Sequence, residues 1–141
     1  MVHALRQARQ HLRSNGAVVL IQPHQYKRPH VAIASGGRRQ PVAALVNPVF
    51  QPLINAANAA IQSVVDERLF KRTGTSHHQF TVLVANPTEM HRYLHQGQRP
   101  PRFPSGGRQR LQALWSARPA GAQIEVTEFL TVIALRAVSR R

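Results

Sequence analysis

Cysteine is absent from this sequence, and acidic residues are scarce. Without cysteine the chain has no disulfide bridge, no thiolate nucleophile and no zinc site built from thiolates. Only five Asp and Glu residues stand against 19 Lys and Arg. Asp66 and Glu67 are adjacent on a predicted helix and so point apart, which makes them poor partners for acid–base catalysis. We therefore expect a non-catalytic protein that needs no cofactor.

Long hydrophobic runs are also missing. The longest, from Phe129 to Ala137, is interrupted by Thr131 and Arg136. It falls well short of the roughly 20 residues that a membrane-spanning helix needs. A membrane partner is therefore not expected, with a peripheral association as the weaker alternative. The chain of 141 residues, 43% of them hydrophobic, favours one folded domain over two domains or a disordered chain.

What the sequence has in abundance is positive charge. Its formal net charge is +14 and its isoelectric point is near 12.0. Such a chain repels itself and favours a polyanionic partner, most often nucleic acid. Since Lys27 and Lys71 are the only lysines, 17 of the 19 cations are Arg. Arg pairs with phosphate through a planar fork and stacks on bases, so the bias favours RNA.

Residues 1–40 are predicted to form a basic N-terminal extension. Within it, residues 3–14 carry Arg6, Arg9 and Arg13 at near-helical spacing without any acid, and an Asn-Gly pair follows. This pattern predicts a basic helix that ends in a Gly signal. A solvated surface helix and an organelle-targeting segment both fit it.

Residues 23–30 combine two prolines with cations and one aromatic ring. Proline keeps the backbone extended, and Tyr26 offers a face for stacking beside Lys27 and Arg28. The segment suits a tail laid along RNA, and an ordinary surface loop is the alternative.

The tetrapeptide Ser-Gly-Gly-Arg occurs twice, at residues 35–38 and 105–108. Adjacent glycines let backbone N–H groups turn towards an anion, and the arginines that follow supply charge. Each copy is therefore a candidate phosphate site, with these cations: Arg38, Arg39, Arg108 and Arg110. Neither copy has the GxxxxGK[ST] spacing of a nucleotide-binding loop. Two flexible turns with solvated arginines are the alternative.

Residues 41–141 are predicted to form a single α+β domain. Its clearest element is a helix over residues 52–72, because apolar residues recur there at steps of three and four. A Gly-containing stop is expected at residues 71–76. The fold class that follows is a two-layer sandwich, a mostly antiparallel sheet with helices on one face.

The remaining predicted elements are strands at 17–22, 31–34, 41–46, 80–85 and 122–127, helices at 88–95 and 107–117, and a Pro-rich basic loop at 96–107. Thr88 is expected to cap the first of those helices. The loop adds Arg99 and Arg102 to the candidate phosphate contacts. Residues 129–141 either continue the last strand or form a short helix.

Histidines and aromatics give weaker signals. His91 and His95 would share a helix face, and the adjacent His77-His78 pair could supply a third metal ligand. No HExxH motif is present, so we expect these histidines on a solvent or RNA-facing surface and expect no metal. Tyr93 and Phe103 each follow an arginine and are candidates for stacking, whereas Trp115 and Phe80 follow apolar periodicities and are expected in the core.

Four segments carry a resemblance to a known family. Residues 49–61, VFQPLINAANAAI, resemble the first strand-to-helix passage of the S-ten family of small-subunit ribosomal proteins. Residues 71–74 and 80–84 are similar to that family's helix end and following strand, and residues 120–126 to its last strand. The resemblance implies a two-layer α+β domain that packs among rRNA and neighbouring proteins without catalysis, and that extends a long hairpin.

The chain departs from that pattern in two regions. Residues 88–104 replace the second half of the hairpin with a helix and a Pro-rich loop, and about forty N-terminal residues are extra. These departures favour a divergent, mitochondrial version of the family.

Our leading hypothesis is a structural constituent of a ribosome, mitochondrial or otherwise cytoplasmic. Its expected partners are rRNA and neighbouring ribosomal proteins, with no small-molecule substrate. We expect RNA contacts from these residues: Arg6, Arg9, Arg13, Tyr26, Lys27, Arg28, Arg38, Arg39, Arg99, Arg102, Arg108 and Arg110. Two other classes stay open: a non-catalytic scaffold subunit of a respiratory complex or viral particle, and a histidine-dependent metalloenzyme or nuclease.

Overall fold

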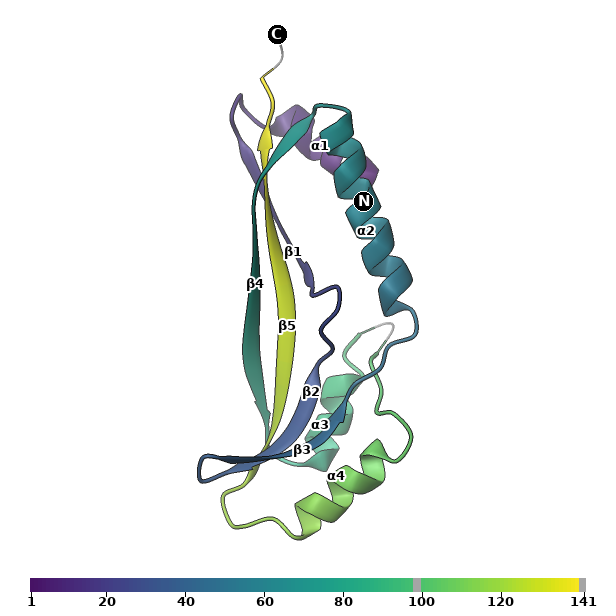
Figure 1. The fold of residues 1–141 in the computed structure, drawn as a ribbon, viewed down its shortest axis with the longest axis vertical. Coiled ribbons are helices and arrows are strands. Elements are labelled where there is room, and N and C mark those ends of the chain that lie inside the picture. Colours follow the sequence, from purple (N-terminus) through teal and green to yellow (C-terminus); the bar gives the residue numbers. More distant parts are fainter. Residues whose placement is uncertain (98–99, 140–141) are drawn as a thin grey trace. The chain divides into compact units, whose positions relative to one another are not determined.

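A computed structural model describes residues 1–97 and 100–139 of the protein. Its helices are α1 (Val2–His11), α2 (Phe50–Asp66), α3 (Pro87–Leu94) and α4 (Gly107–Ser116). Its strands are β1 (Ala17–Pro23), β2 (His30–Ser35), β3 (Arg38–Ala44), β4 (Phe70–Val84) and β5 (Gln123–Ala137) (Figure 1). The predicted α+β class with an antiparallel sheet is confirmed.

Strand β5 is the centre of the sheet. The order along the sheet is β1-β5-β2-β3, and β4 also pairs with β5. β1 pairs with the C-terminal part of β5, from Ala17 opposite Arg136 to Pro23 opposite Leu130. β2 pairs with its N-terminal part, with His30 opposite Thr127. The 1–40 segment, expected as an extension, therefore contributes two strands to the sheet.

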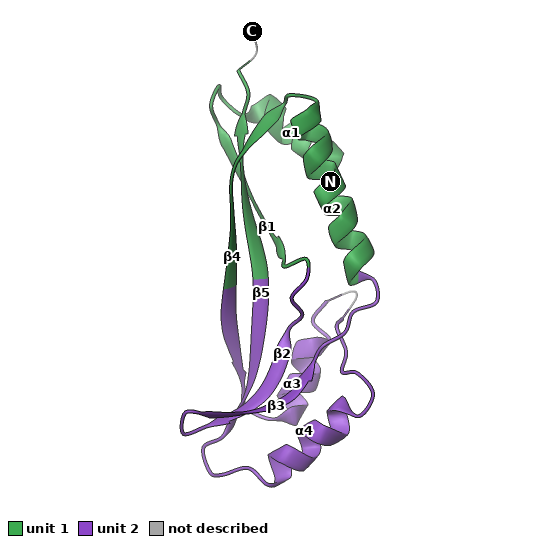
Figure 2. Ribbon diagram, viewed as in Figure 1, with its two compact units in different colours: residues 1–25, 50–78, 130–141 green, residues 26–49, 79–129 purple. Residues whose placement is uncertain are grey.

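The chain divides into two compact units. Unit 1 comprises residues 1–25, 50–78 and 130–141, and unit 2 comprises residues 26–49 and 79–129 (Figure 2). Strands β4 and β5 each begin in one unit and end in the other. Each unit has a hydrophobic core of its own.

The core of unit 1 joins α1 and α2 to the sheet. Its buried side chains are Leu5, Ile61, Val64, Phe70, Ile133, Leu135 and Ala137. β1 covers this cluster with alternate residues, because Val18 and Leu20 pack against it opposite Leu135 and Ile133. On the other side of β1, Val19 and Ile21 are 61% and 70% exposed. The sheet of unit 1 thus has one helix-covered face and one open apolar face.

The core of unit 2 joins β2, β3 and the first half of β5 to α3 and α4. Its buried side chains are Val31, Ile33, Val42, Leu45, Val84, Met90, Leu94, Leu111, Ala122, Ile124 and Val126. Val31 lies opposite Val126 and Ile33 opposite Ile124 in the sheet. In the part of β5 that belongs to unit 2, the buried residues are even-numbered, Ile124 and Val126, whereas in the part that belongs to unit 1 they are odd-numbered, such as Ile133 and Leu135. The change falls where β5 passes from unit 2 into unit 1.

The predicted end of the long helix was wrong. The helix stops at Asp66, and the predicted stop at residues 71–76 lies inside β4. Arg68 has a positive φ of 56°, its N–H donates to Val65 O over 2.9 Å, and Leu69 N–H donates to Val64 O over 3.1 Å. These are the two hydrogen bonds of a Schellman motif, which ends a helix at a left-handed residue. Arginine gives no sequence signal for that conformation.

Three smaller expectations were also wrong. Helix α3 is capped by Asn86, not Thr88: Asn86 Oδ1 accepts from Glu89 N–H over 2.9 Å, and Pro87 occupies a first-turn position. Helix α1 ends at His11, three residues before the expected end. Phe80, expected in the core, is 47% exposed. The open choice for residues 129–141 is decided in favour of the strand, since β5 continues to Ala137.

The left-handed residue at the end of α2 gives a stability prediction. Arg68→Gly should raise the free energy of unfolding by about 0.5–1 kcal/mol, because glycine adopts a positive φ without a steric penalty. Urea denaturation of the full chain measures the change. Lys71→Gly, two residues into a strand, is the control and should lower stability. A loss of stability in Arg68→Gly would contradict the assigned helix end.

Candidate nucleic-acid interface

Arg6 and Arg9 on α1, and Arg13 just after it, lie in different environments. Arg6 forms a bidentate ion pair with Glu67, with Nη2 and Oε1 2.6 Å apart and Nε and Oε2 3.0 Å apart. Hydrogen bonds from Arg6 lower the pKa of the Glu67 carboxyl. Arg13 is exposed beyond the end of the helix. Glu67, just after α2, therefore offsets the charge of Arg6, whereas Arg13 forms no ion pair with an acid of the described residues.

Arg9 is placed differently from the other predicted contacts. It is only 7% exposed, and its Nη2 donates to the backbone oxygen of Val138. The guanidinium therefore joins α1 to the chain just after β5, and little of it is left to meet a phosphate. Its position in the sequence, three residues after exposed Arg6 and four before exposed Arg13, carries no sign of this role.

The segment from Tyr26 to Arg28 is exposed in unit 2, as the extended-tail prediction requires. Tyr26 is 80% exposed. Lys27 Nζ lies 5.3 Å from the centroid of the Phe129 ring, and His30 meets the same ring edge-on at 5.6 Å. A cation at this distance is attracted to the ring face. Lys27 and His30 thus both contact the Phe129 ring on the sheet. The sequence analysis does not predict a functional role for Phe129.

The first Gly-Gly-Arg copy forms the turn between β2 and β3. Gly36 and Gly37 have φ values of 57° and 78°, and Ser35 pairs with Arg38 across the turn. A two-residue hairpin turn of the primed type requires such positive φ values. The glycines are thus needed for the hairpin itself, and Arg38 is exposed beside its tip.

Arg39 on β3 reaches across β2 to an acid of β5. Its Nε lies 2.6 Å from Glu125 Oε2, and the two side chains are 65% and 14% exposed. The contact is an ion pair without the angle of a hydrogen bond, so buried Oε2 has no hydrogen-bond donor among the described residues. The Glu125 carboxylate therefore depends on the charge of Arg39. Of the two adjacent arginines, Arg39 has a structural role and Arg38 is exposed to solvent.

The second Gly-Gly-Arg copy begins helix α4. Gly106 has a φ of 78°, and Gly107 is buried so tightly that a Cβ there would lie 3.0 Å from two atoms of Phe103. Arg108 is exposed, whereas Arg110 donates from Nε to Pro41 O over 3.0 Å. The two copies of the tetrapeptide thus serve different turns, a hairpin and a helix start.

The Pro-rich loop is tied to the chain before α2. Arg102 and Val46 exchange two backbone hydrogen bonds of 2.8 Å each, and the side chain of Arg102 is exposed. Arg99, the other predicted contact in this loop, lies outside the described residues.

Several basic residues that the sequence analysis does not predict as RNA contacts are also exposed. Lys71 and Arg72 belong to a stretch of β4, Lys71 to Phe80, in which every residue is exposed. Arg118 stacks its guanidinium 3.9 Å from the centroid of Trp115 and donates to the Trp115 carbonyl over 2.7 Å. An exposed strand lacks the alternation of apolar and polar residues by which strands are recognised. The sequence therefore predicts a helix end at Lys71 and Arg72, where the structure has a strand.

The stacking candidate Tyr93 has other surroundings than expected, whereas His91 and His95 are exposed, as expected. Tyr93 is half-buried and donates from its hydroxyl to Glu128 Oε1 over 2.7 Å; burial, together with this carboxylate, raises the pKa of Tyr93. The rings of His91 and His95 lie 4.2 Å apart. Across residues 1–97 and 100–139, no group of three or more His, Cys, Asp or Glu side chains gathers to hold a metal ion.

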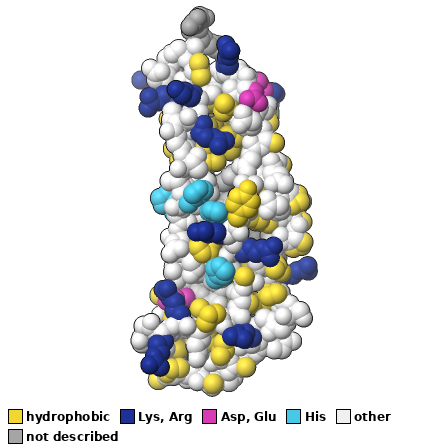
Figure 3. Space-filling model, viewed as in Figure 1, with side chains coloured by type: hydrophobic (Ala, Val, Ile, Leu, Met, Phe, Trp, Pro, Cys, Tyr) yellow, Lys and Arg dark blue, Asp and Glu magenta, His cyan; other side chains and the backbone are white. Residues whose placement is uncertain are grey.

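The summed electrostatics favour an anionic partner in both units. Five acids cannot neutralise 19 cations, and two of the five, Glu67 and Glu125, already face arginines. On the face drawn in Figure 3, Lys and Arg side chains spread over both units while Asp and Glu appear at few places. Within the described part of the chain, no helix is long and apolar enough to span a bilayer.

The Arg39–Glu125 pair gives a second stability prediction. Arg39→Ala should lower the free energy of unfolding by about 1 kcal/mol, because it leaves a nearly buried carboxylate without its cation. Arg38→Ala, the matched control one residue away, should change it little. Glu125→Gln added to Arg39→Ala should restore part of the loss. Equal effects of the two arginine variants in urea denaturation would contradict the assignment.

No protein-family model matches the chain, and neither a curated protein nor a solved structure matches it.

Proposed function

We propose that this chain is a structural RNA-binding component of a ribosome, with no catalytic role of its own. The observation that carries the proposal is the large excess of exposed arginine over acid in a chain with a folded core in each unit. When arginines bind RNA phosphates, they displace the counterions that were bound there, and the release of these counterions drives binding. The hydrophobic cores hold the arginines at fixed positions, so binding costs less ordering than it would in a disordered basic tail.

Within the proposal, the structure divides the predicted contacts into two groups. Arg6, Arg9 and Arg39 have partners inside the chain and hold α1 and the β2–β3 hairpin in place. The other described candidates are exposed and are proposed to meet RNA, including Arg110, which also donates to Pro41 O, and Lys27, which also lies over the Phe129 ring; they are Arg13, Tyr26, Lys27, Arg28, Arg38, Arg102, Arg108 and Arg110. Lys71 and Arg72 join this second group.

The ribosomal assignment draws its support from the resemblance to the S-ten family. The resembling residues 49–61 occupy the start of α2 and the turn before it, and residues 123–126 lie at the start of β5. A small-subunit position, in a mitochondrial or cytoplasmic ribosome, is the form of the proposal that this resemblance favours. Neighbouring ribosomal proteins would be its other partners.

The open apolar face of unit 1 favours a second candidate function. Val19 and Ile21 are 61% and 70% exposed on successive outward positions of β1, and exposed apolar side chains on one sheet face suit a contact with another protein. A scaffold subunit of another large assembly would use that face and direct its charge at acidic partners. The two candidates differ in whether RNA or protein neutralises the arginines.

Salt dependence of RNA binding tests the proposal. Replacing Arg28 and Arg38 by Gln should weaken binding of the full chain to a structured RNA and reduce the slope of log K against log salt by about 0.7–0.9 per lost phosphate contact. Arg118→Gln, which removes one charge already stacked on Trp115, should leave the slope nearly unchanged. Filter binding or fluorescence anisotropy over a salt series measures it. An unchanged slope in the double variant would count against these contacts.

A further inference from the structure

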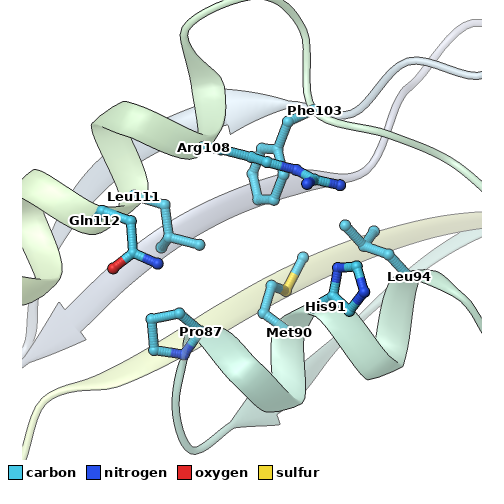
Figure 4. A pocket seen from close by; sticks show the side chains of 8 residues that line it. All are labelled: Pro87, Met90, His91, Leu94, Phe103, Arg108, Leu111 and Gln112. Carbon is cyan, nitrogen blue, oxygen red and sulfur yellow. The ribbon is translucent and has the colours of Figure 1, made fainter.

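A pocket between α3 and α4 in unit 2 is unused by the function proposed above. Its volume is about 140 Å³, and it is lined by Pro87, Met90, His91, Leu94, Phe103, Arg108, Leu111 and Gln112 (Figure 4). Pockets for drug-sized ligands measure roughly 300–1,000 Å³, whereas an apolar cavity of about 150 Å³ holds one benzene molecule. The pocket therefore has room for a single ring system and for little more.

The floor of the pocket is apolar, and its side chains are shielded from water. Met90, Leu94 and Leu111 are 0%, 2% and 3% exposed. Phe103 contributes an aromatic wall, which is held in place by the tight packing of Gly107 against it. Methionine sulfur and aromatic faces are favourable neighbours for a planar ring, so the floor suits an aromatic ligand better than a branched aliphatic one.

The mouth of the pocket is polar and positively charged. His91, Arg108 and Gln112 are exposed at its rim. In Figure 4, Arg108 extends from α4 toward the side of the pocket with Phe103 and His91, and Gln112 lies at the other side, by Leu111 and Pro87. Neither Arg108 nor Gln112 makes a side-chain hydrogen bond or ion pair with another described residue. Their donors and acceptors are therefore available to a ligand.

We propose that this pocket binds one unstacked nucleotide of the RNA, with the base inside and the phosphate outside against Arg108. A ring-sized apolar floor with a hydrogen-bonding amide and a cation at its mouth matches a nucleobase that carries an anionic group. Gln112 offers both a donor and an acceptor to the polar edge of the base, and His91 adds a ring nitrogen. The proposal rests on the RNA-binding function above and deepens it, because it adds a site that recognises a base to arginines that recognise only phosphate.

The two methionines provide a direct readout. Met90 lies in the pocket, and Met1, the only other methionine, lies in unit 1. With methyl-¹³C methionine in the full chain, the four nucleoside 5′-monophosphates are titrated separately to millimolar concentrations. The Met90 methyl resonance should shift through the ring current of the base, and the Met1 resonance should not. At least one nucleotide should then bind more tightly than the others.

Variants at exposed positions identify the groups that bind. Gln112→Ala should weaken the nucleotide that shifts Met90 by about three- to tenfold, which corresponds to one lost hydrogen bond. Arg108→Gln should weaken it by about tenfold, through loss of a charge-assisted contact. Gln109→Ala, on the same helix and away from the pocket, is the matched control and should have no effect.

The outcomes separate this proposal from the general one. If Met90 stays unmoved by every nucleotide while structured RNA still binds the full chain, the pocket proposal is wrong and RNA binding stands. If neither nucleotides nor RNA bind, both proposals are wrong. A shift of Met90 by a leucine-rich peptide and not by any nucleotide would overturn the proposal in favour of a protein side chain in the pocket.

Discussion

Backbone pairing along β5 is the interaction on which the rest of the structure depends. β5 accepts β1 and β2 in succession along its length and β4 as well, so each unit builds its half of the sheet on the same strand. Ile124 and Val126 anchor the core of unit 2, and Ile133 and Leu135 anchor that of unit 1. Loss of pairing along β5 would therefore remove a shared support from both hydrophobic cores.

The second constraint is charge, and it acts against folding. At +14 the folded chain repels itself, and each core must offset that repulsion. The few acids are used where they relieve it most: Glu67 holds α1 through Arg6, and Glu125 holds the hairpin through Arg39. An anionic partner would relieve the remaining repulsion, so the bound protein should be more stable than the free one. Charge thereby links the stability of the chain to its proposed partner.

The sequence predicted elements with strong periodicity and failed where tertiary pairing decided the structure. Residues 107–117 were predicted as a helix and form α4, and the α+β class followed from the order of elements. Residues 71–79 are polar, contain a glycine and are exposed, so only hydrogen bonding to β5 makes them a strand. Arg9 and Arg13 are alike in sequence, yet one is buried. The α3–α4 pocket combines residues up to 25 positions apart, from Pro87 to Gln112, which no local pattern reveals.

The measurement that tests the account most directly is sedimentation of the native protein in extract of the cells that make it, with and without ribonuclease. The account predicts co-migration with a ribosomal particle and release of the chain when the RNA is digested. A large particle that survives digestion unchanged would contradict the ribosomal account and favour the scaffold alternative. Migration as a free small protein before digestion would contradict both.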